Sequence, residues 1–182
     1  AMLHIPECDV FLHSGDTLDW DEQIFLLKEI RSRYPKALHI AGGPHANFFP
    51  EESEKLFDAL VFGEGEETLV EAIGDVMAGK LKKVYRQVQP IDINKYPFAL
   101  RKFQPHSAVA RKGMLTLKNK PGFDQLLGTT VMFSRGCPYR CHFCAMPRMK
   151  DFAAGIRFRS PFWIEKEIEY LKSEFGIQGI NL

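Results

Sequence analysis

Short apolar runs and helix-like segments alternate along the first half of the chain. Runs typical of strands, each ending at turn-forming or polar residues, occupy residues 9–13, 37–41 and 59–62. Helices are predicted between and after them, at residues 20–34, 50–57 and 66–77. In the first helix, Ile24, Leu27 and Ile30 recur at the spacing of one helical face, and Pro35 ends the pattern. Strands that alternate with helices predict an α/β fold with a parallel sheet.

A fourth strand is predicted at residues 83–88, the last element of a partial Rossmann-like first domain over residues 1–88. Three or four strands are few for an open sheet that must cover both of its faces with helices. The chain is therefore expected to begin within such a domain and to lack its first βαβ unit.

The pattern changes after residue 88. Residues 89–128 have no clear periodicity and carry prolines at 90, 97, 105 and 121, which predicts an irregular connector. Order returns with a β-branched run at 129–133, a helix from Pro161 or Phe162 to Phe175, and a strand at 177–182. Residues 129–182 are therefore expected to form the start of a second domain, a strand followed by a helix.

Composition narrows the class of protein. The chain has 182 residues, of which 45% are hydrophobic and 26% charged, enough for a sizeable core. Its 24 basic and 23 acidic residues nearly cancel, so overall charge favours neither nucleic acid nor an anionic membrane. No signal-peptide pattern and no apolar run of membrane-spanning length is present, which predicts a cytoplasmic location. Three of the 4 cysteines lie within eight positions, a pattern typical of a metal site in a reducing compartment.

The three clustered cysteines are Cys137, Cys141 and Cys144. Thiolates on one tight loop can converge on a single metal cluster, and Gly136 supplies backbone freedom next to the first of them. Electron-transfer ferredoxins use four cysteines per cluster, so three leave one iron open to a substrate or cofactor. The fourth cysteine, Cys8, is interpreted as a small buried hydrophobic residue at the start of a strand.

Structural zinc is the alternative for this loop, and it needs a fourth ligand within tetrahedral reach. His142 is adjacent to Cys141 and poorly placed for that role. A distant histidine could serve only if the fold brought it near. Local spacing and ligand number therefore favour an iron–sulfur cluster.

The segment from Ser134 to Cys144 closely resembles the cluster loop of radical S-adenosylmethionine (radical SAM) enzymes. Three further segments, in this order, are similar to the subfamily that carries a cobalamin-binding domain: 42–46, 63–67 and 157–161. The resemblance implies a flavodoxin-like, cobalamin-binding type of sheet, followed by the first βα unit of a radical SAM TIM-type barrel. It covers nearly the whole chain.

The resemblance also implies cofactors and roles. Cys137, Cys141 and Cys144 would hold a [4Fe-4S] cluster, and S-adenosylmethionine would bind the open iron and be cleaved to a 5'-deoxyadenosyl radical. Phe143 would pack near the adenine, although it could equally shield the cluster, and Arg159 is a second candidate for S-adenosylmethionine binding. The electron would come from an external donor such as flavodoxin or ferredoxin.

A cobalamin site is expected where the predicted strands end. The nucleotide tail of the corrinoid would lie in a crevice at the carboxyl ends of parallel strands, where glycines allow close approach. The candidates to line it are Ser14, Gly15, Gly42, Gly43, Pro44, Gly63 and Glu64. A plain turn before a helix is the alternative at Gly42 and Gly43. The early Asp-x-His-x-x-Gly motif that supplies a lower axial histidine in many such domains is absent from this sequence.

Basic residues gather around the cysteine loop, at positions 135, 140, 148, 150, 157 and 159. Nucleic-acid binding is conceivable there, but charge compensation for an anionic cluster is the simpler interpretation. Two other functions stay open: a corrinoid-binding module with a non-functional cluster loop, and a zinc-stabilised structural domain. A homo-oligomer stays open, and the chain alone is not expected to catalyse a complete reaction.

Overall fold

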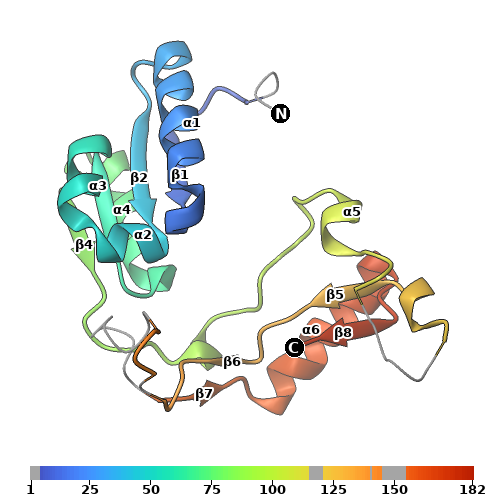
Figure 1. The fold of residues 1–182 in the computed structure, drawn as a ribbon. Helices are drawn as coiled ribbons and strands as arrows, with labels where there is room; N and C mark the ends of the chain where they lie inside the picture. The colour runs from blue at the N-terminus through green and yellow to red at the C-terminus, as the bar shows by residue number, and fades with distance from the viewer. Residues whose placement is uncertain (1–4, 115–120, 140, 145–154) are drawn as a thin grey trace. The chain divides into compact units, whose positions relative to one another are not determined.

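The structure is a computed structural model that describes residues 5–114, 121–139, 141–144 and 155–182. The chain divides into two compact units. The first comprises residues 1–91 together with 139–154, and the second comprises residues 92–138 together with 155–182. The first unit contains a four-stranded sheet, and the second contains two two-stranded sheets (Figure 1). Each unit also has its own cluster of buried apolar side chains.

The first unit is built on a four-stranded sheet in the order β1-β2-β3-β4. Its strands are β1 (Val10–Ser14), β2 (Leu38–Gly42), β3 (Ala59–Phe62) and β4 (Val84–Arg86). All three neighbouring pairs are parallel, and the register places Ser14 beside Gly42 at the carboxyl ends of β1 and β2. The predicted α/β class and parallel sheet are therefore confirmed, with four strands in the sheet.

The helices of this unit follow the strands as expected, with one addition. They are η2 (Thr17–Asp19), α1 (Trp20–Arg33), α2 (Gly43–Phe48), α3 (Pro50–Leu56) and α4 (Gly65–Met77). Helix α2 was not predicted, because Gly42-Gly43-Pro44 resembles a turn. Gly43 has a φ of 84°, and Pro44, in the first turn of α2, favours an immediate helix start.

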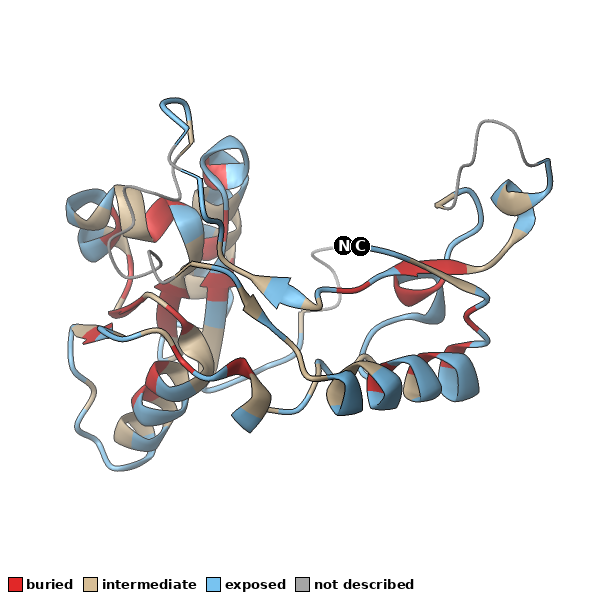
Figure 2. Ribbon diagram, turned by 90° about the horizontal axis from the view of Figure 1, so that it is seen from below, coloured by how far each residue is buried: buried red, intermediate tan, exposed pale blue. Residues whose placement is uncertain are grey.

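Alternate side chains of the central strands face opposite sides of the sheet. Ile40, Ala59 and Val61 pack with Ala72 of α4 in one cluster. Ala41, Leu60 and Phe62 pack with Trp20 and Leu27 of α1 in another. Strands covered on both faces become apolar throughout, which explains the short continuous apolar runs in the sequence. Figure 2 shows these strands as buried.

The second unit contains a βαβ arrangement. Strand β5 (Gly128–Thr130) pairs in parallel with β8 (Gly179–Asn181), and α6 (Pro161–Phe175) lies between them in the sequence. A second ladder joins β6 (Ser134–Arg135) and β7 (Arg157–Phe158) in antiparallel pairing. The strands near 129 and 180 and the helix from 161 were predicted, whereas the β6–β7 ladder was not. The assignment of this unit to a TIM-type barrel stays a prediction.

The connector contains short helices: η3 (Ile93–Lys95), α5 (His106–Val109) and η4 (Phe123–Gln125). Its Arg101 donates hydrogen bonds to the hydroxyl of Thr129 on β5 (2.8 Å) and to the carboxylate of Glu167 on α6 (3.3 Å). Burial raises the pKa of Glu167, and the Arg101 charge opposes that shift. The connector is therefore tied to β5 and α6 by a polar network that sequence periodicity could not reveal.

In the described part of the chain, no helix is long and apolar enough to span a membrane.

Candidate functional site

A cavity of about 280 Å³ lies at the carboxyl ends of β1, β2 and β3. Open parallel sheets bind ligands at the edge formed by the carboxyl ends of their strands. Its lining residues are Leu12, His13, Ser14, Ile40, Ala41, Gly42, Gly43, Val61, Gly63, Gly65 and Leu69.

Glycines let the backbone crowd around this cavity. A Cβ atom on Gly43 would lie 2.7 Å from the hydroxyl oxygen of Ser14, and one on Gly42 would lie 3.1 Å from the carbonyl oxygen of Val61. Gly43 also has a positive φ, which residues with a Cβ rarely adopt. A side chain at Gly43 would therefore press on the end of β1, and one at Gly42 would press on the backbone of β3.

Asn47 ties two of these turns together. Its side-chain amide donates to the carbonyl oxygen of Gly43 at 2.7 Å, and its side-chain oxygen accepts from the amide of Gly63 at 3.2 Å. Gly63 has a φ of 82°, and a Cβ there would lie 2.8 Å from the carbonyl oxygen of Gln87. Asn47 lies on the unpredicted helix α2, so the sequence carried no signal for this bridge.

Four of the seven residues predicted to bind cobalamin line the cavity: Ser14, Gly42, Gly43 and Gly63. Gly15 accepts a backbone hydrogen bond from His45 (3.2 Å), and Pro44 lies in the first turn of α2. Glu64 is 3% exposed, and its carboxylate accepts from the amide of Ile91 at 2.9 Å. The contact of these residues with a ligand stays a prediction, and the bond to Ile91 gives the Glu64 carboxylate a structural partner.

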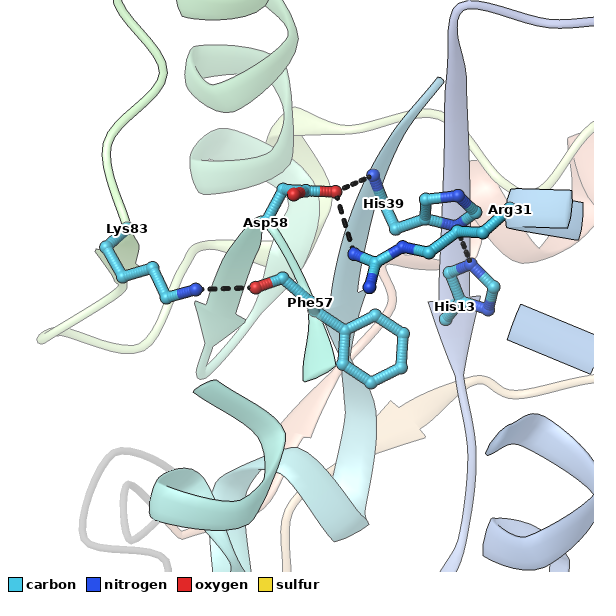
Figure 3. Close-up of polar contacts among 6 residues, drawn as sticks. All are labelled: His13, Arg31, His39, Phe57, Asp58 and Lys83. Carbon is cyan, nitrogen blue, oxygen red and sulfur yellow. Dashed lines mark hydrogen bonds and ion pairs between the residues drawn. The ribbon is translucent and has the colours of Figure 1, made fainter. Parts of the chain in front are cut away.

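His13 enters the cavity from β1 as half of a buried histidine pair. Its Nε2 lies 3.0 Å from Nδ1 of His39 on β2 (Figure 3). Burial lowers the pKa of His13, and a hydrogen bond with the side chain of Gln23 opposes that shift. Burial also lowers the pKa of His39 to about 4, helped by the neighbouring His13 and Arg31. Both imidazoles are therefore neutral near pH 7, and one donates to the other.

Asp58 joins this pair to α1. Its Oδ2 accepts from the backbone amide of His39 at 2.8 Å and from the guanidinium of Arg31 at 3.2 Å (Figure 3). At the residue before Asp58, the carbonyl oxygen of Phe57 accepts a hydrogen bond from the ammonium of Lys83 at 2.6 Å. The segment leading into β3 is therefore bonded to β2 on one side and to Lys83, the residue before β4, on the other. None of these residues stood out in the sequence, because an isolated histidine in an apolar run carries no spacing signal.

His45, from the segment 42–46 that carried the family resemblance, is buried by aromatic packing. Its ring stacks on Trp20, with centroids 3.7 Å apart, and on Phe49 at 4.7 Å. Its Nδ1 lies 3.2 Å from the hydroxyl of Thr17. His45 thus anchors α2 against the start of α1.

The three cysteines of the cysteine loop have free thiols. Cys137, in the second unit, and Cys141, in the first, are exposed, and Cys144 is partly buried. The amide of Cys144 donates to the carbonyl oxygen of Cys141 at 3.1 Å, a tight turn between two of the predicted ligands. Among the described residues, no three His, Cys, Asp or Glu side chains form a group that could hold a metal ion. Ligation by the three cysteines stays a prediction, and Arg140, Arg148 and Lys150 lie outside the described residues.

The base of this loop is closed by the β6–β7 ladder. Ser134 pairs with Phe158 and Arg135 with Arg157. One residue beyond the ladder, Gly136 has a φ of 96°, and a Cβ there would overlap the carbonyl oxygen of Gly155. The backbone before Cys137 and the backbone before β7 therefore touch, so the loop begins and ends at one place.

The two residues predicted to bind S-adenosylmethionine differ in their surroundings. Phe143 is 93% exposed, so its ring is available to a ligand. The guanidinium of Arg159 instead donates to the carbonyl oxygens of Tyr96 and Pro97 in the connector. Its role toward S-adenosylmethionine stays a prediction, and two of its donors are already used within the protein.

Cys8 corrects one expectation. It was interpreted as a buried hydrophobic residue, but it is exposed, because it lies in the non-regular segment just before β1. The apolar run of the strand begins after it.

The chain is similar in sequence to several known proteins. The chain is 28% identical over 189 residues to the anaerobic magnesium-protoporphyrin IX monomethyl ester cyclase of Synechocystis, which covers 98% of the chain and 36% of the relative. The cyclase of the same name from Cereibacter sphaeroides is 31% identical over 163 residues, 83% of the chain and 26% of the relative. The cobalamin-dependent radical SAM methyltransferase TokK of Streptomyces tokunonensis is 29% identical over 157 residues, 77% of the chain and 22% of the relative.

Two other comparisons assign neither a family nor a fold. The chain matches no protein-family model. The N-terminal domain of a hypothetical protein from Thermotoga maritima covers 42% of the chain at 28% identity, with a TM-score of 0.36, too low to support a conclusion.

The relatives are enzymes, namely cyclases and methyltransferases. The chain is accordingly related to radical SAM enzymes, the class indicated by its cysteine loop. It spans only about a quarter to a third of the length of the first relatives, 36% and 26%.

Proposed function

We propose that the chain is part of a cobalamin-dependent radical SAM enzyme that transfers a methyl group or performs related radical chemistry. The observation that carries the proposal is the Cys137, Cys141, Cys144 spacing, in a chain 29% identical to a cobalamin-dependent radical SAM methyltransferase. The closed base of the loop and the crevice at the strand ends of the first unit support it.

The donor set of the loop fits a cluster. The described thiols form no disulfide, and two of the three are exposed, so they are chemically available as thiolate ligands. Three thiolates suit a four-iron cluster that keeps one iron open. When bound, such a cluster supplies the electron that cleaves S-adenosylmethionine. The chain's own contribution is to hold the cluster through Cys137, Cys141 and Cys144 and to present the exposed ring of Phe143 beside them in the sequence.

The crevice fits part of a cobalamin. Its volume of about 280 Å³ is at the lower end of small-molecule sites, which suits a narrow appendage such as the nucleotide tail and not a whole corrinoid. Ser14 offers a hydroxyl there, and Gly42 and Gly43 keep the turns free of side chains. In this proposal Ser14, Gly15, Gly42, Gly43, Pro44, Gly63 and Glu64 form or support the tail site.

Anaerobic reconstitution with iron and sulfide tests the proposal. We expect about four irons per chain and a reduced-cluster electron paramagnetic resonance (EPR) signal that changes when S-adenosylmethionine is added. Stoichiometric zinc without iron would support a zinc-stabilised domain instead. Cobalamin binding without iron would support a corrinoid-binding module.

A further inference from the structure

Asn94 of the connector contacts three successive parts of the segment that follows the cysteine loop. Its side-chain amide donates to the carbonyl oxygen of Phe158 at 3.2 Å, at the end of β7. Its side-chain oxygen accepts from the amide of Ser160 at 2.7 Å. Its backbone carbonyl accepts from the indole of Trp163 at 2.8 Å, in the first turn of α6. Strand, helix cap and helix are thus joined to one residue 64 positions or more away in the chain.

Ser160 precedes α6 at the N-cap position, but its own side chain makes no capping hydrogen bond. A helix leaves its first amides unsatisfied unless a side chain accepts from them. Asn94 supplies an acceptor at this junction from a distant part of the sequence. The path of the chain from β7 into α6 therefore depends on the connector.

Arg159, between these contacts, is held in the same way. Its backbone amide donates to the carbonyl oxygen of Phe133 at 2.8 Å, which extends the β6–β7 ladder by one bond. Its guanidinium reaches the carbonyl oxygens of Tyr96 and Pro97, two and three residues after Asn94. The connector segment 94–97 is thus hydrogen-bonded to the β7–α6 junction, next to the β6–β7 ladder that closes the cysteine loop.

We propose that Asn94 is a positioning residue that holds the base of the cysteine loop for cluster binding. The inference rests on the proposed function, in which the cysteine loop binds a cluster. Neither the cysteine motif nor the segment 157–161 contains Asn94. Loss of its contacts frees the β7–α6 junction, and the ladder beside Gly136 and Cys137 then loses its support on the β7 side.

The test compares Asn94→Ala with Asn94→Asp and with Lys95→Ala. The aspartate keeps an acceptor for the Ser160 amide but loses the donor to Phe158. Lys95 is the next residue of η3 and is exposed, so its variant is a matched control. Each full chain is measured by amide hydrogen exchange without a cluster, and then by iron content and EPR after anaerobic reconstitution.

We expect the Ser160 and Arg159 amides of Asn94→Ala to exchange about fivefold faster, the effect of losing one ordinary hydrogen bond. Amides of β1–β3 in the first unit should not change. Asn94→Asp should fall between wild type and Asn94→Ala, and Lys95→Ala should match wild type. In the reconstituted protein, Asn94→Ala should lose the EPR change caused by S-adenosylmethionine, a readout that general destabilisation at equal iron content would not alter.

The inference is overturned if Asn94→Ala exchanges, reconstitutes and responds to S-adenosylmethionine as Lys95→Ala does. If wild type itself assembles no cluster, the proposed function fails. The exchange data then decide separately whether Asn94 holds the β7–α6 junction.

Discussion

Nε2 of His13 lies 3.0 Å from Nδ1 of His39, in the interior of the four-stranded sheet unit (Figure 3). The two residues lie on neighbouring strands with a separation of 26 in the sequence. One ring must donate and the other accept, so the contact requires at least one neutral imidazole. Protonation of both would place two positive charges side by side near Arg31.

We expect this pair to make the protein sensitive to acid. Both folded-state pKa values lie below the ordinary value of 6.5, and that of His39 is about 4. The unfolded chain therefore binds protons first as pH falls, and the stability from neutral burial is present above pH 6.5 and is lost toward pH 4. Urea unfolding at a series of pH values between 7.5 and 4 should show this fall.

His39→Gln tests the origin of the fall. Glutamine keeps a polar side chain without a titrating group, so the loss of stability between pH 6.5 and 4 should be smaller than in wild type. An equally steep loss in the variant would assign the effect to other groups.

Gly43→Ala should destabilise the first unit by about 2 kcal/mol, because a Cβ is strained at positive φ and meets Ser14. It should also weaken cobalamin binding by narrowing the crevice. Gly74→Ala is the matched control. Gly74 is exposed in the interior of α4, and nothing lies within 4 Å of a Cβ at this position, so alanine should raise the free energy of unfolding by about 1 kcal/mol. Thermal unfolding and cobalamin titration check both; equal stability in the two variants would contradict the crowding at Gly43.

Cys144→Ala should abolish cluster assembly and leave the four-stranded sheet folded, because two thiolates cannot hold the cluster. Cys8→Ala removes a thiol from the same unit at an exposed site outside the loop, so it should retain wild-type iron content. Iron analysis and far-UV circular dichroism measure the two effects. A full iron complement in Cys144→Ala would refute the assignment of this ligand.

Gly136→Ala should open the base of the cysteine loop, because its Cβ would overlap the Gly155 carbonyl. Gly113→Ala introduces the same positive-φ strain, at a φ of 80°, without any atom within 4 Å of the Cβ. We therefore expect a loss of iron binding of at least several-fold for Gly136→Ala only. Parallel loss in both variants would mean that strain alone, and not overlap, is responsible.

The sequence by itself determined most of the longer strands and helices and the positions of the candidate reactive groups. Short apolar runs predicted β1 to β3 to within about a residue, and helical spacing predicted α1, α4 and α6. These signals are local, because they depend on residues a few positions apart. The cysteine spacing and the glycines after β1, β2 and β3 are local in the same sense, so their chemistry could be predicted.

Only the tertiary structure decided which distant groups meet. The bond between Asn47 and the Gly63 amide, the His13–His39 pair and the bond between Asn94 and the Ser160 amide join residues 16 to 66 positions apart. A polar residue that serves a distant backbone group leaves no periodic pattern in its own neighbourhood. Burial also differs between two residues that the sequence predicted to bind ligands: Glu64 is buried and bonded to Ile91, whereas Phe143 is exposed. These partnerships depend on how strands and connector pack, which short-range patterns do not encode.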